Sequence, residues 1–170
     1  MNGDAMSETT TPNDDQGAKS DGSPSLRVLA QYLKDLSFES PKAPAIFATL
    51  QGAPSISVNV DVGARTIGQD QYEVELSVAC KSMHENEPIF VTEITYAGAF
   101  EIKNIPAEQM ELVLLVECPR LLFPFLRQAL ADTTQSGNFP PVMLDPVDFL
   151  AIYEQNRARN GSAPSIAQNP

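Results

Sequence analysis

The chain has 170 residues, a mass of 18.4 kDa and 42% apolar residues, which suffices for one compact domain with flexible ends. Its 22 acidic residues and 11 Lys and Arg residues leave a net charge of -11. This charge argues against binding to nucleic acid, because the phosphate backbone attracts cationic surfaces. No apolar run approaches the ~20 residues of a membrane-spanning helix, so we expect a soluble protein without direct membrane insertion.

The two ends of the chain differ in composition from its centre. Residues 1–24 are rich in Asn, Asp, Ser, Thr and Gly, and contain too few apolar side chains to offset the entropy lost on ordering. We therefore predict a disordered N-terminal arm, a folded domain over residues 25–159 and a flexible tail over residues 160–170. The arm lacks the basic and hydrophobic regions of a secretory signal, which favours a cytoplasmic location.

Four segments in the first part of the domain alternate between apolar and polar residues, as half-buried β-strands do. They are residues 26–39, 56–64, 72–81 and 89–102. Turn-forming residues between the later segments favour an antiparallel meander. In the first segment the predicted core face contains Leu26, Val28, Ala30, Tyr32, Leu36 and Phe38, and the opposite face contains Asp35, Ser37 and Glu39. The sheet is thus predicted to have one apolar face and one acidic face.

A long helix is predicted to begin near Pro106 and to end near Gly137, which is placed where helices commonly reverse into the left-handed conformation. Pro119 and Pro124 lie inside it and are expected to bend or restart it. Its centre is apolar on every side, so it must be covered from two directions, and we predict a subunit interface on one of them. The predicted interface residues are Leu114, Cys118, Leu121 and Leu122.

A second helix is predicted with Asp145 as its N-cap, Pro146 in its first position and Asp148 near the positive end of the helix dipole. Its apolar stripe contains Phe149, Ile152 and Tyr153. Residues 138–144 join the two helices and are unusually hydrophobic for a connecting loop. Strands followed by helices predict an α+β fold, with a four-stranded antiparallel meander, a long kinked helix and a second helix.

The residues that would carry catalysis or hold a cofactor are few. His84 is the single histidine, and with Cys80 and Cys118 it cannot complete a closed zinc shell of four ligands. Motifs that cradle nucleotide phosphates do not occur. The acidic pair Glu73 and Glu75 is expected to lie on a solvated strand face. We expect no enzymatic activity, no metal and no cofactor, and two buried thiols in a reducing compartment.

Three segments, in this order along the chain, resemble the SecB protein-export chaperones. They are YLKDLSFESPKAP from Tyr32, ECPRLLFPFLR from Glu117 and GNFPPVMLDPVDF from Gly137. The resemblance spans about residues 26–157, and the acidic arm rich in Ser and Thr suggests an alphaproteobacterial member. It implies a four-stranded antiparallel sheet with two helices, assembled as a homotetramer that is a dimer of dimers.

The resemblance also implies a function. SecB-like proteins hold unfolded precursors of secreted proteins and deliver them to the SecA motor, without using ATP and without catalysing a reaction. In that family the motor docks on the acidic outer face of the sheet, and the matching positions here are Asp35, Glu39, Val91 and Glu93. Client polypeptides bind hydrophobic grooves, for which the matching apolar residues are Phe38, Ile46, Phe47, Phe139, Met143, Leu144, Phe149 and Tyr153.

Two other functions remain open at this point. A SecB-like regulator that guards an antitoxin would use the same groove, whereas a small-molecule-binding protein or enzyme would close the apolar strip into a pocket. The chain also departs from the family pattern: it has no tryptophan soon after Pro44, and Glu117 stands where an aromatic residue is frequent. Its tail beyond residue 160 carries no charge.

Overall fold

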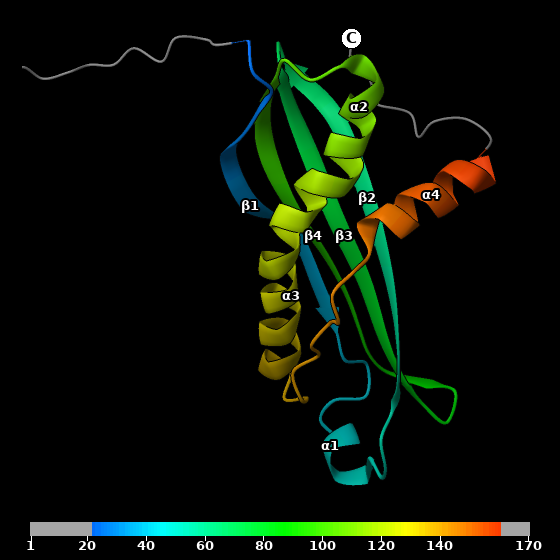
Figure 1. Ribbon diagram of the computed structural model, residues 1–170. Coiled ribbons are helices and arrows are strands. Elements are labelled where there is room, and N and C mark those ends of the chain that lie inside the picture. The colour runs from blue at the N-terminus through cyan, green and yellow to red at the C-terminus, as the bar shows by residue number, and fades with distance from the viewer. Residues whose placement is uncertain (1–21, 161–170) are drawn as a thin grey trace, which may run out of the picture.

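The computed structural model describes residues 22–160, which form one sheet with helices on one of its faces (Figure 1). The strands are β1 (Ser25–Glu39), β2 (Ser55–Gly68), β3 (Gln71–His84) and β4 (Glu87–Lys103), and each neighbouring pair is antiparallel. The predicted four-stranded antiparallel sheet is therefore confirmed. The predicted arm and tail lie outside the described residues, apart from residues 22–24 and residue 160.

The strand order is β1-β4-β3-β2, so the predicted meander comprises only the last three strands. Short turns join these strands, and the β3–β4 turn has positive φ at both Glu85 and Asn86, as suits a hairpin. The connection from β1 to β2, residues 40–54, is too long for a hairpin and includes the short helix α1 (Ile46–Thr49). It carries the chain to the far edge of the sheet, and β1 pairs with β4 instead.

β1 departs from a regular strand at two β-bulges, which lie between Val28 and Ala30 and between Leu33 and Asp35. Each bulge inserts one extra residue, so the side chains that follow move to the opposite face of the strand. The first bulge turns Ala30 and Tyr32 to the outer face, which the described helices leave uncovered. The prediction that these two residues face the core is wrong.

The second bulge restores the original phase of β1. Asp35 and Glu39 therefore lie on the outer face, opposite Thr95 and Val91 of β4, and Phe38 returns to the core face. The two insertions cancel, which is why a regular alternation predicted the faces correctly in the last third of the strand.

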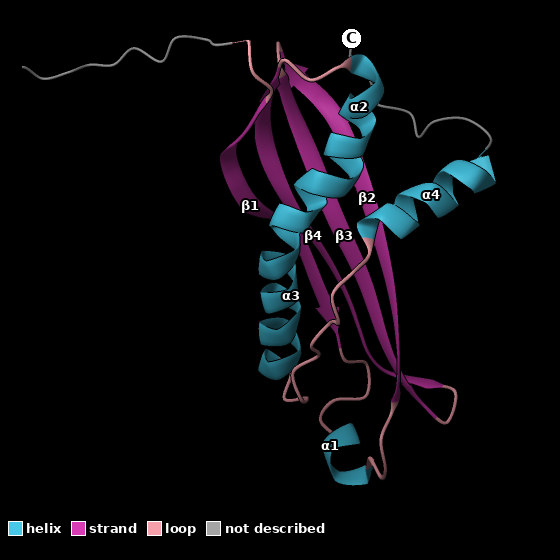
Figure 2. Cartoon of the chain, in the orientation of Figure 1, coloured by secondary structure: helices cyan, strands magenta, loops and turns pink. Residues whose placement is uncertain are grey.

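The long helix lies on the inner face of the sheet, whereas the short helix α1 lies beyond one end of the strands, as Figure 2 shows. The long helix consists of α2 (Ala107–Leu112), a π-helical turn η1 (Val113–Glu117) and α3 (Cys118–Ser136). The predicted interruption falls at Pro119, which has no N–H to donate, and the N–H of Cys118 just before it bonds to the carbonyl of Val113, five residues back. No helix within residues 22–160 is long and apolar enough to cross a membrane.

The end of α3 differs from the prediction. Gly137 has a φ of -76°, and the left-handed residue is Asn138, with a φ of 64°. Gly137 is needed for space instead, because a Cβ at this position would lie 2.3 Å from the ring of Phe38. The glycine thus allows β1 and the end of α3 to meet.

The start of the second helix also differs from the prediction. Helix α4 spans Phe149–Asn160, and its N-cap is Asp148, whose Oδ1 accepts a hydrogen bond of 3.0 Å from the N–H of Ala151. Asp145 and Pro146 belong to the connector. Leu144, just before them, is buried, and the chain remains extended there. The helix begins at Phe149, whose side chain lies in the core.

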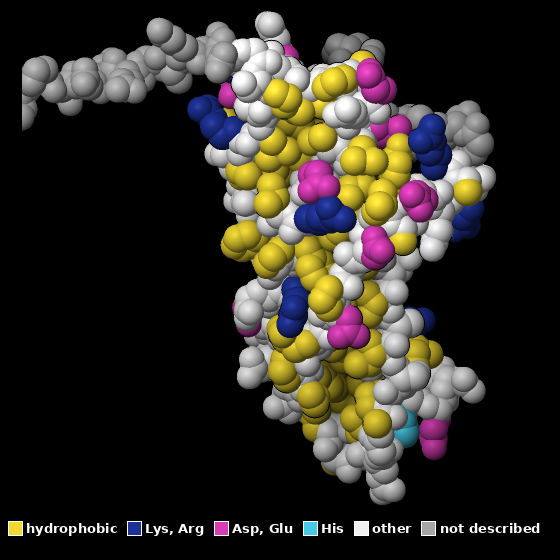
Figure 3. All heavy atoms as spheres, viewed as in Figure 1, with side chains coloured by type: hydrophobic (Ala, Val, Ile, Leu, Met, Phe, Trp, Pro, Cys, Tyr) yellow, Lys and Arg dark blue, Asp and Glu magenta, His cyan; other side chains and the backbone are white. Residues whose placement is uncertain are grey.

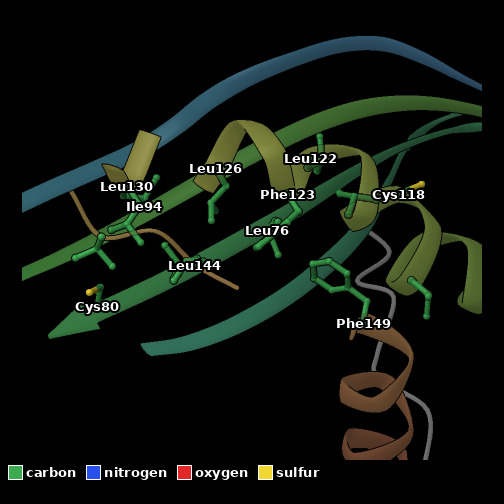
Figure 4. Packing of buried hydrophobic residues seen from close by; sticks show 14 of the residues in the cluster. Leu76, Cys80, Ile94, Cys118, Leu122, Phe123, Leu126, Leu130, Leu144 and Phe149 are labelled. Carbon is green, nitrogen blue, oxygen red and sulfur yellow. The ribbon is translucent and has the colours of Figure 1, made fainter. Parts of the chain in front are cut away.

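The core lies between the inner face of the sheet and the long helix (Figure 4). Its most deeply buried members include Leu76, Ile94, Leu114, Leu122, Leu126 and Leu130. Gly98 on β4 allows the close approach of helix and sheet, since a Cβ there would lie 2.9 Å from the side chain of Leu122. Phe149 of α4 enters the same core and packs edge-on against Phe123, with ring centroids 5.9 Å apart.

Candidate binding groove and acidic sheet face

An apolar groove opens between β2, at the edge of the sheet, and the connector that joins α3 to α4. It has a volume of about 960 Å³. The sheet contributes Ile56, Val58, Ser82 and Phe90, and the connector contributes Phe139, Val142, Met143 and Leu144. Ile56 and Val58 face inward but are not covered by the long helix, so they remain 49% and 40% exposed. Figure 3 shows hydrophobic side chains along this face of the molecule.

The connector forms a fixed wall of this groove. Pro140 and Pro141 restrict its backbone and have no N–H to donate. On either side of them, the N–H of Phe139 bonds to the carbonyl of Thr134 at 3.1 Å, and the N–H of Val142 bonds to the Thr134 hydroxyl at 3.0 Å. Thr134 is fully buried in α3. These bonds hold the connector extended against the helix.

Four aromatic rings from different segments form a cluster, and two of them, Phe90 and Phe139, line the groove. Phe139 of the connector lies 5.0 Å from Phe90 of β4 and 5.4 Å from Phe47 of α1, measured between ring centroids. Phe38 of β1 stacks on Phe90 at 5.7 Å. The structure therefore brings together three of the residues that the sequence assigned to the groove, Phe38, Phe47 and Phe139.

The other predicted groove residues lie in three different places. Met143, which is 53% exposed, and Leu144 line the groove. Ile46 is buried and lines a smaller neighbouring cavity of about 260 Å³. Phe149 and Tyr153 belong to the core: Phe149 is 1% exposed, and the Tyr153 hydroxyl donates to Oε2 of Glu111 on α2 at 3.0 Å. In this structure the two α4 residues do not line the groove.

Sequence reasoning missed the contribution of the sheet to the groove. The register places Ile56, Val58 and Phe90 on the face of the sheet that also carries the core. The strand pattern alone cannot tell which part of that face a helix covers. Ser82 was also missed; its hydroxyl is buried in this region and has no hydrogen-bond partner among the described residues.

The predicted motor-binding residues lie together on the outer face of the sheet. In the β1–β4 pairing, Glu39 lies opposite Val91, and Glu93 lies opposite Ser37, two residues from Asp35. The three acidic residues are exposed, whereas Val91 is half-buried. We call these four residues the acidic patch. They lie on adjacent positions of β1 and β4, with Val91 next to Glu39 and two residues from Glu93.

Another acidic residue of the outer face, Glu73, is buried, against expectation. The side chain of Glu73 is 4% exposed, because Tyr32, Lys34 and Arg65 surround it and all three donate hydrogen bonds to its carboxylate. Burial alone would raise the pKa of Glu73, but these hydrogen bonds and the charge of Lys34 outweigh it and lower the pKa to about 2. Glu75, which also accepts a bond from Lys34, is half-buried.

Three of the four predicted interface residues are not available to a partner. Leu114, Cys118 and Leu122 have no exposed surface, because they belong to the hydrophobic core of the single chain. Only Leu121, at 42%, is exposed. The long helix nevertheless has an uncovered apolar side, where Leu121 is followed one turn later by Phe125, which stacks on Tyr96 with centroids 5.8 Å apart.

The cysteines are both free and buried. Burial raises the pKa of Cys80, and burial together with the charge of Glu117 raises the pKa of Cys118 to about 12. Such thiols stay protonated and are poor nucleophiles and metal ligands. Among residues 22–160, no three His, Cys, Asp or Glu side chains are grouped as metal ligands would be.

Comparison with known proteins identifies a family that matches this chain. A family model described as preprotein translocase subunit SecB matches residues 19–160. A protein-export protein SecB from Maricaulis maris is 49% identical over 153 residues, which cover 90% of this chain and 87% of that protein. The protein of that name from Parvibaculum lavamentivorans is 44% identical over 165 residues, which cover 95% of this chain and 96% of that protein.

Among solved structures, a Mycobacterium tuberculosis SecB-like chaperone in complex with a ChAD peptide from an antitoxin has a similar fold. The two match with a TM-score of 0.59 at 13% sequence identity. The match covers 72% of this chain and 90% of that chain. At this identity the likeness concerns the arrangement of sheet and helices.

Proposed function

Because the chain belongs to the SecB family, we propose that it is an ATP-independent chaperone of the cytoplasm, which binds unfolded precursors of exported proteins and delivers them to the SecA motor. The observation that carries this proposal is the exposed apolar groove beside β2. A small-molecule pocket buries most of its ligand's surface, whereas this groove leaves Ile56 and Met143 about half exposed along the edge of the sheet. An extended polypeptide is the ligand that such a groove fits.

Holding a client requires a surface that prefers an unfolded chain to a native one. An unfolded chain can lay apolar side chains on Val58 and Met143, and each Å² of apolar area removed from water contributes ~25 cal/mol. A native protein has already buried most such side chains. The chaperone therefore binds the unfolded state selectively and delays folding by mass action. A flexible thioether and exposed aromatic rings such as that of Phe47 suit clients of many sequences.

Delivery requires a second surface, and we assign it to the acidic patch. Asp35, Glu39 and Glu93 would steer a basic region of SecA during encounter, and Val91 would add apolar contact once the surfaces meet. The groove lies on the inner side and at the edge of the sheet, whereas the patch lies on its outer face. A client and the motor can therefore bind the same subunit at one time.

We also propose assembly as a homotetramer, and the apolar surface that one chain leaves open supports it. Leu121 and Phe125 on α3 are 42% and 49% exposed, and Leu33 and Leu36, on the inner face of the neighbouring β1, are exposed as well. A continuous apolar surface of this kind is typical of a subunit interface. The interface that we propose therefore uses the outer side of α3 with β1, and not the buried residues of the long helix.

The proposed function is tested by mixing the purified protein with a denatured secretory precursor without nucleotide. We expect suppressed aggregation, delayed refolding and a complex detectable by light scattering, whereas the same precursor in its native state should not bind. Failure to capture the denatured precursor would reject the chaperone function. In cells, loss of an export chaperone should accumulate uncleaved precursors, whereas loss of an antitoxin guard would release a toxin.

A further inference from the structure

The ion-pair cluster around Glu73 spans three strands of the sheet. Lys34 comes from β1, Glu73 from β3 and Arg65 from β2, and β4 lies between the first two. The Lys34 ammonium is 3.0 Å from both oxygens of the Glu73 carboxylate. Lys34 also bonds Glu75, two residues further along β3. The cluster therefore ties the edge strand β1 to a strand that it does not pair with.

This reach across β4 depends on small side chains. On β4, Ala97 lies between Tyr32 of β1 and Glu75 of β3, and Ala99 lies between Ala30 of β1 and Glu73 of β3. A larger side chain at either position would stand between the ammonium and the carboxylates. Ala97 is fully buried beneath the cluster.

Lys34 also occupies a special place in β1. It is the residue inserted at the second bulge, between Leu33, which pairs with Tyr96, and Asp35, which pairs with Thr95. An inserted residue lies outside the regular pairing, so the backbone ladder does little to fix it. The side-chain bonds of Lys34 to Glu73 and Glu75 supply the missing restraint.

The position of the bulge decides what the outer face presents. With the insertion at Lys34, the side chains of Asp35 and Glu39 point outward and that of Phe38 points inward. Without it, the alternation of the following residues would be inverted, turning carboxylates toward the core face and Phe38 toward solvent. We propose that Lys34 and Glu73 are positioning residues for the acidic patch: their ion pair holds the second bulge of β1 and so keeps Asp35 and Glu39 on the outer face. The identity of the partner at the patch rests on the proposed function.

The sharpest test is Lys34→Met, because the two possible roles of Lys34 predict effects of opposite sign. If Lys34 acted only through its charge, its removal would make the face more negative and binding of a basic motor tighter. If it positions β1, Lys34→Met should weaken binding of SecA to the full-length protein about tenfold, or about 1.4 kcal/mol. Lys34→Arg, which keeps the ion pair, should restore it. Tighter or unchanged binding by Lys34→Met would overturn the inference.

A matched control separates position from charge. Glu101 is also an outer-face carboxylate of the sheet and pairs with Arg27 of β1, far from the second bulge. Glu73→Gln and Glu101→Gln remove the same charge, and we expect a clear loss of SecA affinity only for Glu73→Gln. Equal losses in both variants would contradict the inference.

Hydrogen exchange supplies a readout that does not involve the motor. In Lys34→Met and Glu73→Gln, the amides of residues 30–39 should exchange faster, whereas those of β3 and α3 should keep wild-type rates. Unchanged exchange in β1 would overturn the inference even if the wild-type protein binds both client and SecA. If instead the wild-type protein binds neither, the proposed function fails, and exchange in β1 still decides whether the ion pair holds the bulge.

Discussion

At the scale of single residues, Glu73 shows the limit of reading a strand by its pattern. Its position on the outer face was predicted, and the register confirms it. Its burial was not, because the three side chains that cover it come from positions 32, 34 and 65, and two of these lie on a strand with bulges. Contacts that depend on β-bulges in β1 cannot be predicted from the sequence around Glu73 alone.

The Glu73 cluster predicts a specific dependence of stability on pH. The pKa of Glu73 is about 2 in the folded state against an ordinary 4.5, so the unfolded chain takes up the proton first as the pH falls. The stabilisation is complete above about pH 4.5 and is lost towards pH 2, and it amounts to on the order of 3 kcal/mol. Tyr32, Lys34, Arg65 and Glu75 are the titratable groups that face this carboxylate.

Urea unfolding between about pH 2 and 5 checks this prediction. The free energy of unfolding of the wild-type protein should fall with acidification more steeply than that of Glu73→Gln, in which the titrating group is absent. The remaining carboxylates are common to both proteins and cancel in the difference. Identical slopes would show that Glu73 does not carry the effect.

At the scale of elements, the sequence predicted which segments form strands and helices better than how they join. Hydrophobic periodicity located all four strands, and Pro119 located the interruption of the long helix, whereas the interruption expected at Pro124 does not occur, since α3 continues through it. The pairing of β1 with β4 depends on a 15-residue connection whose path is set by packing, here the contact of Phe47 with Phe139. The start of α4 depends on the buried Leu144. The strand pairing and the helix start both depend on tertiary packing, so local secondary-structure propensity cannot predict them.

The contact of Gly137 with Phe38 predicts a stability effect at the end of α3. Gly137→Ala places a Cβ 2.3 Å from the ring of Phe38, so the ring or the connector must move, and we expect a loss of about 1–3 kcal/mol. Gly63→Ala is the matched control, since nothing lies within 4 Å of a Cβ there. Thermal unfolding of both variants measures the difference. Equal melting temperatures would mean that the contact does not constrain the fold.

At the scale of the whole molecule, apolar residues serve two purposes. Those between sheet and helix form a closed core, whereas those beside β2 and on the outer side of α3 remain exposed in one chain (Figure 3). The sequence predicted that the long helix has more apolar surface than one sheet can cover. It could not divide that surface between core, groove and interface, because Leu121 and Leu122 are neighbours with the same chemistry and opposite exposure.

Substitutions on the exposed side of α3 are predicted to disrupt assembly without unfolding the chain. Leu121→Asp or Phe125→Asp should produce folded smaller species, because the new charge faces solvent in the single chain but would be buried and unpaired in the assembly. Leu122→Asp should instead unfold the chain. Light scattering with circular dichroism distinguishes these outcomes, and Ile67→Asp, at an exposed apolar site on β2, serves as the control. A full-size Leu121→Asp assembly would exclude this surface as the interface.

The most direct test of the account is the affinity of Val58→Glu for a denatured secretory precursor, measured against Ile67→Glu. Both sites lie on β2 and are similarly exposed, at 40% and 44%, but only Val58 lines the groove. We expect Val58→Glu to bind the precursor at least about tenfold more weakly, since a carboxylate must be desolvated on binding, and Ile67→Glu to match the wild-type protein. Equal capture by all three proteins would contradict the claim that clients bind in this groove.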